Sequence, residues 1–355
     1  MSGRGPGPDL PGDWSASQAD LRWDAFVDAN PRATYLQLSG WARSKAANGW
    51  APWPVEARAP GGPIGARILL RRPAGIPWTF AYAPRGPLAS VLDRASLERF
   101  TERLQAAVSE PDRRADRISH VRIDPEIELD GPDDPEGSLQ AALVGLGWRP
   151  APEVQPSVSR VIDLVPDEAA LWAGLRSKWR QYVNKARSSG IRVEDRGRAG
   201  LPEFHAIMTE TAARAGMLIR TEASYRAVWD AFAPSGRVRL LFAVDPDGTP
   251  QATLFLIRTG SRVVEPYGGM TAAGAASRAN YLLKWEAIRS SREAAATSYD
   301  MWGLVHPGIR QFKEGFGGRE VRLIGAFDLD LRRFGARVYR LAETYRGPHR
   351  PGAGT

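Results

Sequence analysis

The sequence predicts an α/β protein of two domains, each a mixed sheet with flanking helices. The chain has 355 residues, of which 43% are hydrophobic, and this length is enough to bury two cores of ordinary size. Strand-like and helix-like segments alternate along both halves. A proline-rich stretch, "RPAPEVQPSVS" at 149–159, separates the halves as a linker would. We therefore predict one domain at 14–158 and a second at 159–329.

The first half combines a hairpin with helices. Two alternating runs joined by a Gly/Pro turn at 55–75 indicate the hairpin, and the strand "HVRIDPEI" at 120–127 is interrupted by a proline. The other predicted elements are a helix around 41–48, an apolar run at 78–88, and helices at 95–110 and 137–148. This order predicts a mixed sheet covered by helices, and it does not fit a doubly wound fold.

The second half contains a clear antiparallel meander. Residues 238–270 alternate apolar and polar side chains across two turns, Asp-Pro-Asp-Gly and Thr-Gly-Ser. The remaining elements are predicted as strands at 160–165, 191–197 and 298–303, helices at 167–190, 201–216, 222–234 and 281–296, and a Gly/Ala/Ser loop at 271–280. This is the order of an acetyltransferase-like (GNAT-like) domain.

The junction between that loop and the next helix, at 271–281, is a candidate floor for a site. A helix N-terminus preceded by small residues offers free amide N–H groups to an anion or a carbonyl. The loop lacks the Gln/Arg-x-x-Gly-x-Gly pattern with which acetyltransferases bind coenzyme A, so acetyl-CoA is not expected as a substrate. The alternative is a flexible linker.

Composition excludes several kinds of chemistry. The chain has no cysteine, and its four histidines, at 120, 205, 306 and 349, lack metal-ligand spacing, so we expect no disulfide, thiolate or metal site. No run of 18 apolar residues and no apolar leader segment occurs, so a cytoplasmic location is expected. Residues 1–13 and 347–355 are Gly/Pro-rich and are predicted to be disordered tails.

The charge indicates a polyanionic partner. The formal net charge is +8, from 48 Lys and Arg against 40 Asp and Glu. The densest basic run lies on the predicted helix at 167–190, where Arg176, Lys178, Arg180 and Lys185 are candidate contacts for a nucleic-acid phosphate backbone. The alternatives are an ordinary solvated helix face and an arginine content that reflects GC-rich coding.

Nine segments, taken in order over residues 33–332, resemble the Fem family (FemA, FemB, FemX), which are aminoacyl-tRNA-dependent transferases that build peptidoglycan cross-bridges. They are "YLQLSGW", "AYAPRGPL", "RIDPEI", "LRSKWRQYVNKARSSGI", "MTETAARAG", "YGGM", "LLKWEAI", "YDMWG" and "FKEGFGG" with "GAFDL" behind it. The long coiled-coil arm of some members is absent here, because no heptad run of that length occurs.

The resemblance implies two GNAT-like domains in tandem, with the C-terminal segment 330–346 completing the first. It implies an enzyme that transfers an amino acid such as glycine, alanine or serine from aminoacyl-tRNA to an amine of a lipid-linked or UDP-linked peptidoglycan precursor. Aminoacyl-tRNA is then the co-substrate, and no other cofactor is expected. A monomer that associates peripherally with the inner membrane face is also expected.

By the same resemblance Lys313 is the catalytic residue, with Phe312 shaping the wall beside it. Lys313 matches the lysine of the family's Phe-Lys-x-x-Phe-Gly segment, next to the ester and the acceptor's amine. The ester is already activated, so transfer needs alignment and stabilisation of the negative charge that develops on its carbonyl oxygen. The alternative for Lys313 is a solvated lysine at a glycine-rich helix end.

The resemblance also assigns substrate-binding positions in the first domain. Lys45 matches a family lysine that contacts the precursor's phosphates. Trp41 ends the matching segment just before it, and Arg85 lies in the matching segment "AYAPRGPL". Asp124 of "RIDPEI" is the one carboxylate in a family segment that we consider as a base. For Lys45 the alternative is a surface charge, and for Asp124 it is a turn cap before Pro125.

Three further positions lie in the second domain. Arg214 matches the family's Thr-x-x-Arg, and its guanidinium can bind a phosphate or a carboxylate in two-pronged fashion; a domain-packing ion pair is the alternative. Tyr267 matches the second tyrosine of a Tyr-x-Tyr strand end. The first tyrosine is replaced by Glu265, which puts the acceptor contact in doubt.

Two other functions stay open from the sequence. One is the same transfer onto a small amine or peptide in natural-product biosynthesis, which Glu265 and the short connection between Gly303 and Phe312 favour. The other is a non-catalytic RNA-binding or membrane-surface-binding protein, against which Lys313 within "FKEGFGG" argues.

Overall fold

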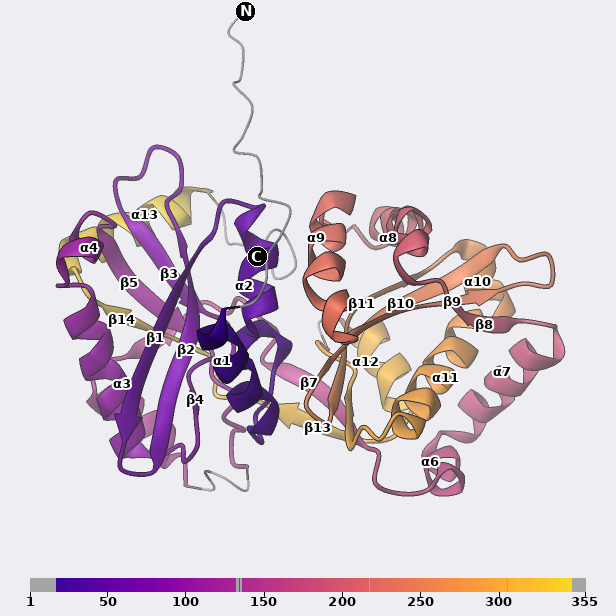
Figure 1. Cartoon of the computed structure of the whole chain (residues 1–355). Helices are drawn as coiled ribbons and strands as arrows, with labels where there is room; N and C mark the ends of the chain where they lie inside the picture. Colours follow the sequence, from indigo (N-terminus) through magenta and orange to yellow (C-terminus); the bar gives the residue numbers. More distant parts are fainter. Residues whose placement is uncertain (1–16, 132–133, 135, 217, 305, 347–355) are drawn as a thin grey trace, which may run out of the picture.

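The computed structural model describes residues 17–346 apart from 132–133, 135, 217 and 305. The predicted tails at 1–13 and 347–355 lie outside the described residues. Two seven-stranded sheets, each with one parallel and several antiparallel pairings, carry helices on their faces (Figure 1). The predicted α/β architecture of two mixed sheets is confirmed.

The first sheet has the strand order β1-β2-β3-β5-β14-β6, with β4 paired to β2. Its strands are β1 (Ala51–Ala59), β2 (Gly62–Arg71), β3 (Thr79–Ala83), β4 (Leu88–Ala89), β5 (Ile118–Ile123), β6 (Arg149–Ala151) and β14 (Ala326–Asp330). Its helices are α1 (Gln18–Ala29), α2 (Ser39–Ala46), α3 (Arg94–Ala107), α4 (Pro111–Arg114), α5 (Ser138–Gly145) and α13 (Arg333–Arg346), with the short 3₁₀ helix η1 (Tyr35–Gln37) before α2.

The C-terminal part of the chain returns to this first sheet. Strand β14 pairs antiparallel with β5 on one side and with β6 on the other. The returning segment begins at Ala326 and not at 330, and β6 lies inside the stretch predicted as a linker. The sequence around β6 does not predict a strand, because β6 pairs with β14, which lies far along the chain. The start of β14 is likewise set by its pairing with β5 and β6.

The second sheet has the order β13-β7-β12-β11-β10-β9-β8. Its strands are β7 (Val158–Asp163), β8 (Arg192–Asp195), β9 (Val238–Val244), β10 (Pro250–Thr259), β11 (Arg262–Met270), β12 (Ser298–Asp300) and β13 (Arg319–Arg322). Its helices are α6 (Glu168–Gly174), α7 (Ser177–Ser188), α8 (Leu201–Ala215), α9 (Glu222–Phe232), α10 (Ala272–Ser277), α11 (Ala279–Glu293) and α12 (Pro307–Glu314), with 3₁₀ turns at 197–200 and 233–235. The predicted meander is the unit β9-β10-β11.

The single helix predicted at 167–190 is wrong, because the chain breaks between α6 and α7. Leu175 is extended and buried, and the backbone N–H of Arg176 donates to the carbonyl of Gly315 at 2.9 Å. The Arg180 guanidinium donates to the carbonyls of Ala173 and Leu175, which lack helical partners after the break. These tertiary contacts replace the helical bonds that an unbroken helix would have.

The loop predicted at 271–280 contains a helix, α10. The hydroxyl of Thr271 caps it by accepting from the backbone N–H of Gly274, and the alanines that follow are strong helix formers. Arg278 then adopts a left-handed conformation and separates α10 from α11. A Cβ on Gly274 would lie 2.0 Å from the carbonyl oxygen of Gln251, so glycine is required where α10 meets β10.

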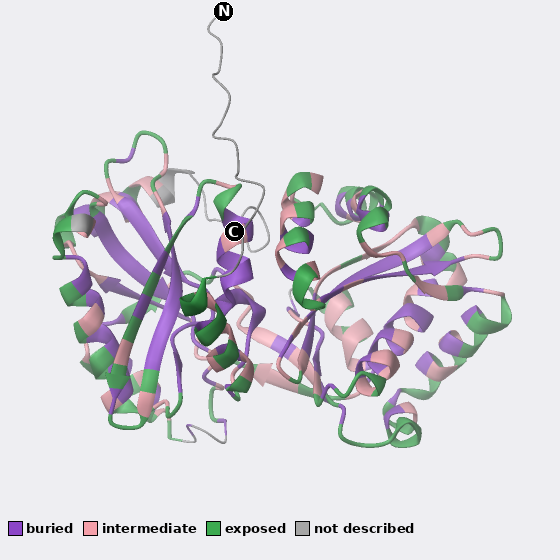
Figure 2. Cartoon of the chain, in the orientation of Figure 1, coloured by how far each residue is buried: buried purple, intermediate pink, exposed green. Residues whose placement is uncertain are grey.

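Buried hydrophobic residues form three clusters, and one of them joins the two domains. Figure 2 shows how far each residue is buried. One cluster lies within the first domain and one within the second. The joining cluster contains Tyr35 and Trp41 from the first domain with Tyr225 and Phe232 from α9. A Cβ on Gly40 would lie 2.8 Å from the ring of Phe232, so α2 and α9 pack closely. This packing places Trp41 beside the second domain.

Candidate active site

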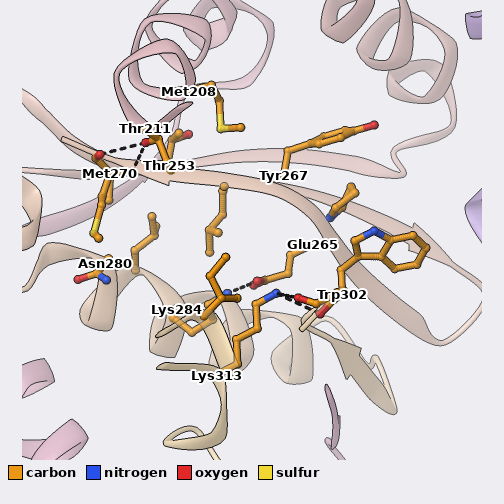
Figure 3. A pocket seen from close by; sticks show the side chains of 18 of the residues that line it. Met208, Thr211, Thr253, Glu265, Tyr267, Met270, Asn280, Lys284, Trp302 and Lys313 are labelled. Atoms are coloured by element: carbon orange, nitrogen blue, oxygen red, sulfur yellow. Dashed lines mark hydrogen bonds and ion pairs between the residues drawn. The ribbon is translucent and has the colours of Figure 1, made fainter. Parts of the chain in front are cut away.

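A cavity of about 590 Å³ lies between the two domains, and Figure 3 shows part of it from close by. The first domain and the connection between the domains contribute Tyr35, Trp41, Gln155 and Pro156. The rest of the wall comes from α8, residues 218–220, α9, β10, β11 and the segments α10 to α12, including the junction at 271–281. Such a site between domains, mostly apolar with a few charged groups, is typical of a substrate pocket.

Lys313 lies in the last turn of α12 at the floor of this cavity. Its Nζ donates to three consecutive backbone carbonyls, those of Met301 at 2.5 Å, Trp302 at 3.0 Å and Gly303 at 3.0 Å. Trp302 has a φ of 59°, and this left-handed conformation lets the three carbonyls surround one ammonium. The alternative of a solvated lysine at a helix end is therefore wrong.

A second lysine and a carboxylate lie next to it. Glu265 on β11 forms a buried ion pair with Lys284 on α11, and the hydroxyl of Tyr299 on β12 donates to Glu265 Oε2 at 2.6 Å. Figure 3 shows Glu265, Lys284 and Lys313 at one end of the pocket. The cavity floor thus combines two ammonium groups and one carboxylate.

Burial lowers the pKa of both lysines. Removal from water lowers the pKa of Lys313 to about 8; the Glu265 carboxylate opposes this and the neighbouring Lys284 ammonium adds to it. Burial also lowers the pKa of Lys284, although its partner Glu265 favours the charged form. Strongly perturbed lysines in a cavity are typical of functional sites.

Phe312 forms the wall beside Lys313. Its ring meets the ring of Tyr281 edge-on at a centroid distance of 5.1 Å, and both residues line the cavity. The indole of Trp179 on α7 donates to the carbonyl of Phe312 at 2.9 Å. A Cβ on Gly315 would lie 2.2 Å from this indole, so the glycine after α12 permits the approach that fixes Phe312 and Lys313.

A second group of cations gathers behind Trp41. Lys45 is 1% exposed, its Nζ lies 4.2 Å from the centroid of the Trp41 ring, and it has no hydrogen-bond partner within the described part of the chain. Burial, then Arg220 and Arg71, hold the pKa of Lys45 well below its usual value. Arg220 lies between Trp41 and Tyr267, 5.8 and 5.7 Å from their rings, and lines the cavity. This arrangement suits an anion.

Lys45 does not line the cavity, and neither do three other predicted substrate-binding residues. Asp124 accepts from the Tyr82 hydroxyl at 2.7 Å and from the backbone N–H of Arg85 at 2.6 Å, and burial raises its pKa to about 6. The Arg85 guanidinium stacks behind Trp302 and donates to the carbonyl of Pro156. Both are structural contacts within and beside the first domain, so the interpretation of Asp124 as a base is not supported.

Arg214 is the third of these residues. It is exposed, pairs with Glu210 on the same helix, and donates to the carbonyl of Met270 at 2.6 Å. It therefore holds the end of β11 and lies outside the cavity. Arg220, a few residues further along the chain, does line the cavity.

The four predicted tRNA contacts divide into two pairs. Arg176 pairs with Glu314 on α12 at 3.1 Å, and Arg180 is bound to the carbonyls at the end of α6. Lys178 and Lys185 are exposed on α7. Of these four, the two lysines are thus the exposed side-chain charges with no ion pair or carbonyl contact in the described part of the chain.

Sequence reasoning missed Lys284 and Arg220. Lys284 belongs to the quoted segment "LLKWEAI", and its position among the buried residues Leu282, Leu283 and Trp285 was a signal that it lies inside. Arg220 follows the apolar "MLI" and had no motif of its own. The described residues contain no group of His, Cys, Asp or Glu that could hold a metal ion.

Comparison with known proteins identifies the family. The model of the FemAB family matches residues 19–246 and 238–344. The chain belongs to the FemAB family. As a FemAB protein it is 28% identical over 228 residues to a lipid II:glycine glycyltransferase of Staphylococcus saprophyticus, a match that covers 62% of this chain and 53% of that one.

A lipid II:glycine glycyltransferase of Staphylococcus aureus is 28% identical over 231 residues, covering 63% of this chain and 53% of that one. This FemAB protein therefore spans about half the length of the curated relatives it matches. Among described residues no helix is both long and apolar enough to cross a membrane.

Solved structures confirm the fold of this FemAB protein. The crystal structure of FemX superposes with a TM-score of 0.78 at 22% identity, covering 91% of this chain and 98% of that one. A tandem GNAT protein from the clavulanic acid biosynthesis pathway gives a TM-score of 0.51 at 14% identity, covering 88% and 94%. The predicted tandem of GNAT-like units is the shared architecture.

Proposed function

We propose that this FemAB protein transfers an amino acid from an aminoacyl-tRNA to a primary amine of a peptidoglycan precursor, forming a peptide bond. The observation that carries the proposal is Lys313 of the family segment, seated with Phe312 at the floor of the inter-domain cavity. The names of the glycyltransferase relatives support a small amino acid and an amine on a lipid-linked precursor.

The chemistry follows from the geometry of the floor. The acceptor amine attacks the ester carbonyl carbon, the C–N bond forms, and the bond to the ribose oxygen of the tRNA breaks. Lys313 places positive charge where the carbonyl oxygen becomes negative. All three N–H donors of Lys313 already meet carbonyls, so the lysine acts through its field or exchanges one carbonyl for the substrate oxygen.

The cation group behind Trp41 suits the phosphates of the acceptor. A buried ammonium without a carboxylate partner is costly, and an anion bound between Lys45 and Arg220 would offset that cost. We therefore propose that these two residues bind the diphosphate of a lipid-linked or UDP-linked precursor, with the amine reaching toward Lys313.

The reaction needs no cofactor beyond aminoacyl-tRNA in this proposal, and a cytoplasmic monomer carries it out. We further propose that the protein approaches a lipid-linked acceptor through helix α13. Phe334 and Leu341 on this helix are 75% and 60% exposed, and Arg333 and Arg337 lie exposed on the same helix. Exposed apolar side chains flanked by arginines suit an anionic membrane face.

The test is transfer by the purified full chain. Transfer RNAs charged with radiolabelled glycine, alanine or serine are each mixed with a UDP-linked muramyl pentapeptide that carries a side-chain amine. The expected result is label in the muropeptide, and acetyl-CoA should yield no acetylated muropeptide. Acetyl transfer from coenzyme A, with no aminoacyl transfer from any of the three charged tRNAs, would contradict the proposal.

A further inference from the structure

Glu265 is the one carboxylate among the described residues that line the cavity. The other charged residues that line the cavity are Arg220, Arg278, Lys284 and Lys313, all of them cations. Its side chain is 4% exposed, so only a group inserted into the cavity can reach it. This acidic position in an otherwise basic pocket has no role in the chemistry described above.

The contacts of Glu265 leave part of its hydrogen-bonding capacity free. Lys284 approaches Oε1 and the Tyr299 hydroxyl donates to Oε2. A carboxylate can accept about four hydrogen bonds, so about two sites remain for a ligand. The two partners also fix the carboxylate in place, as a binding group requires.

The remaining cavity groups suit anions and carbonyls better than an amine. An acceptor that arrives as an ammonium would be repelled by Lys313 and Lys284, unless a negative charge lies next to them. The amine must also lose a proton before it can attack, and a positioned carboxylate is the ordinary acceptor for that proton. Glu265 meets both needs and lies in the electrostatic neighbourhood of Lys313.

We propose that Glu265 binds the nucleophilic amine of the acceptor and takes its proton, with Lys284 and Tyr299 as positioning residues. The inference rests on the proposed aminoacyl transfer. The ammonium gives one proton to Glu265, and the neutral amine then attacks the ester carbonyl carbon. The nitrogen's second proton passes to the departing ribose oxygen. Products are the amide and free tRNA, and Glu265 releases its proton to water.

The experiment needs a variant that removes the carboxylate without stranding a buried ammonium. Glu265→Gln alone leaves Lys284 unpaired and is expected to destabilise the fold. The double variant Glu265→Gln/Lys284→Met removes both charges at similar volume, and thermal unfolding checks that it folds. Lys284→Met alone is the matched control, because it keeps the carboxylate and removes only its partner.

The direct measurement is binding by calorimetry of two probes. One is the UDP-linked muramyl pentapeptide with a free side-chain amine, and the other is the same molecule with that amine acetylated. We expect the wild type to bind the free amine about 10-fold more tightly and the double variant to bind both alike. Single-turnover transfer by the double variant should fall about 100-fold, with unchanged affinity for aminoacyl-tRNA.

The outcomes separate this inference from the proposed function. Wild-type binding of neither probe, with no transfer, would remove the proposed function itself. Equal binding of both probes by the wild type would overturn only the role of Glu265, as would normal transfer by a folded double variant. Loss of affinity for aminoacyl-tRNA in the double variant would also overturn it, because the carboxylate would then serve the donor.

Discussion

Several ionisable side chains of this FemAB protein are buried. Lys313 and Glu265 line the cavity, whereas His120 on β5 lies in the interior of the first domain. The imidazole is 0% exposed, its Nδ1 lies 2.8 Å from the Ser119 hydroxyl, and its Nε2 lies 3.9 Å from an oxygen of Asp328. Burial lowers the pKa of His120 to about 4, while Asp328 opposes the shift.

The first prediction concerns acid stability. Between about pH 6.5 and 4 the unfolded chain protonates this histidine while the folded chain keeps it neutral. The free energy of unfolding therefore falls as the pH falls through this range. Above pH 6.5 the contribution of the neutral histidine to stability is complete. The shift corresponds to about 3 kcal/mol. Denaturant unfolding at pH 4.5 and 7 should show a smaller loss for His120→Gln than for the wild type.

Comparing the wild type with His120→Gln cancels the effect of every other group that titrates equally in both proteins. Asp124, whose raised pKa of about 6 stabilises the fold at low pH, gives a slope of the opposite sign in both. An equal loss of stability in wild type and variant would show that His120 is not the group that titrates.

At the scale of elements, helix α7 presents two exposed lysines that we predict to contact tRNA. Lys178 and Lys185 are exposed, whereas Arg176 and Arg180 are held in contacts of their own. We predict that Lys178→Gln/Lys185→Gln weakens tRNA binding and lowers the slope of log K against log salt by about 1 to 2 units. Filter binding over a range of salt concentrations measures both quantities.

The matched control removes two charges from the first domain. Arg58 and Arg94 are exposed on β1 and α3, and Arg58→Gln/Arg94→Gln changes the net charge by the same amount. The control should keep a slope near that of the wild type. Equal slopes for both double variants would contradict the prediction, because they would show that tRNA does not contact these lysines or that only the overall charge matters.

Helix α13 gives the second prediction at this scale. We expect the wild type to sediment with vesicles of phosphatidylglycerol and phosphatidylcholine, and Phe334→Ser/Leu341→Ser to lose this binding, because insertion of apolar side chains supplies the affinity. Vesicles of phosphatidylcholine alone should bind both proteins weakly. The control is Val144→Ser/Val165→Ser, which removes side chains that are 54% and 71% exposed elsewhere. Equal sedimentation of both variants would contradict the prediction.

The whole molecule shows which features of the fold could be read from the sequence. Alternating patterns and turn residues predict the meander β9-β10-β11 and the hairpin β1-β2, because these signals are local. Strand β6 and the break between α6 and α7 depend on β14 and on Gly315, which lie far along the chain. Helix α1 was not predicted, and it buries Trp23 and Val27 with few other apolar positions.

The residues of the candidate site also divide into those that a sequence motif predicts and those that only the fold brings together. Lys313, Phe312, Trp41, Tyr267 and Glu265 were predicted from family segments, and all of them line the cavity. The partner of Glu265 is a lysine on another element, and no pattern along the chain links the two. Arg214 shows the converse, because a motif placed it in the site and its contacts hold it at the edge of β11.

The central claim is that the inter-domain cavity catalyses aminoacyl transfer through the charge of Lys313. Single-turnover transfer of a labelled aminoacyl group from charged tRNA to the muramyl pentapeptide, at saturating enzyme, separates binding from chemistry. Lys313→Met keeps length and apolar packing but removes the charge, so the rate should fall about 100-fold or more while tRNA affinity stays unchanged. Lys313→Arg should rescue little, since a planar guanidinium cannot meet three carbonyls as the ammonium does. A folded Lys313→Met protein that transfers at the wild-type rate would contradict the account.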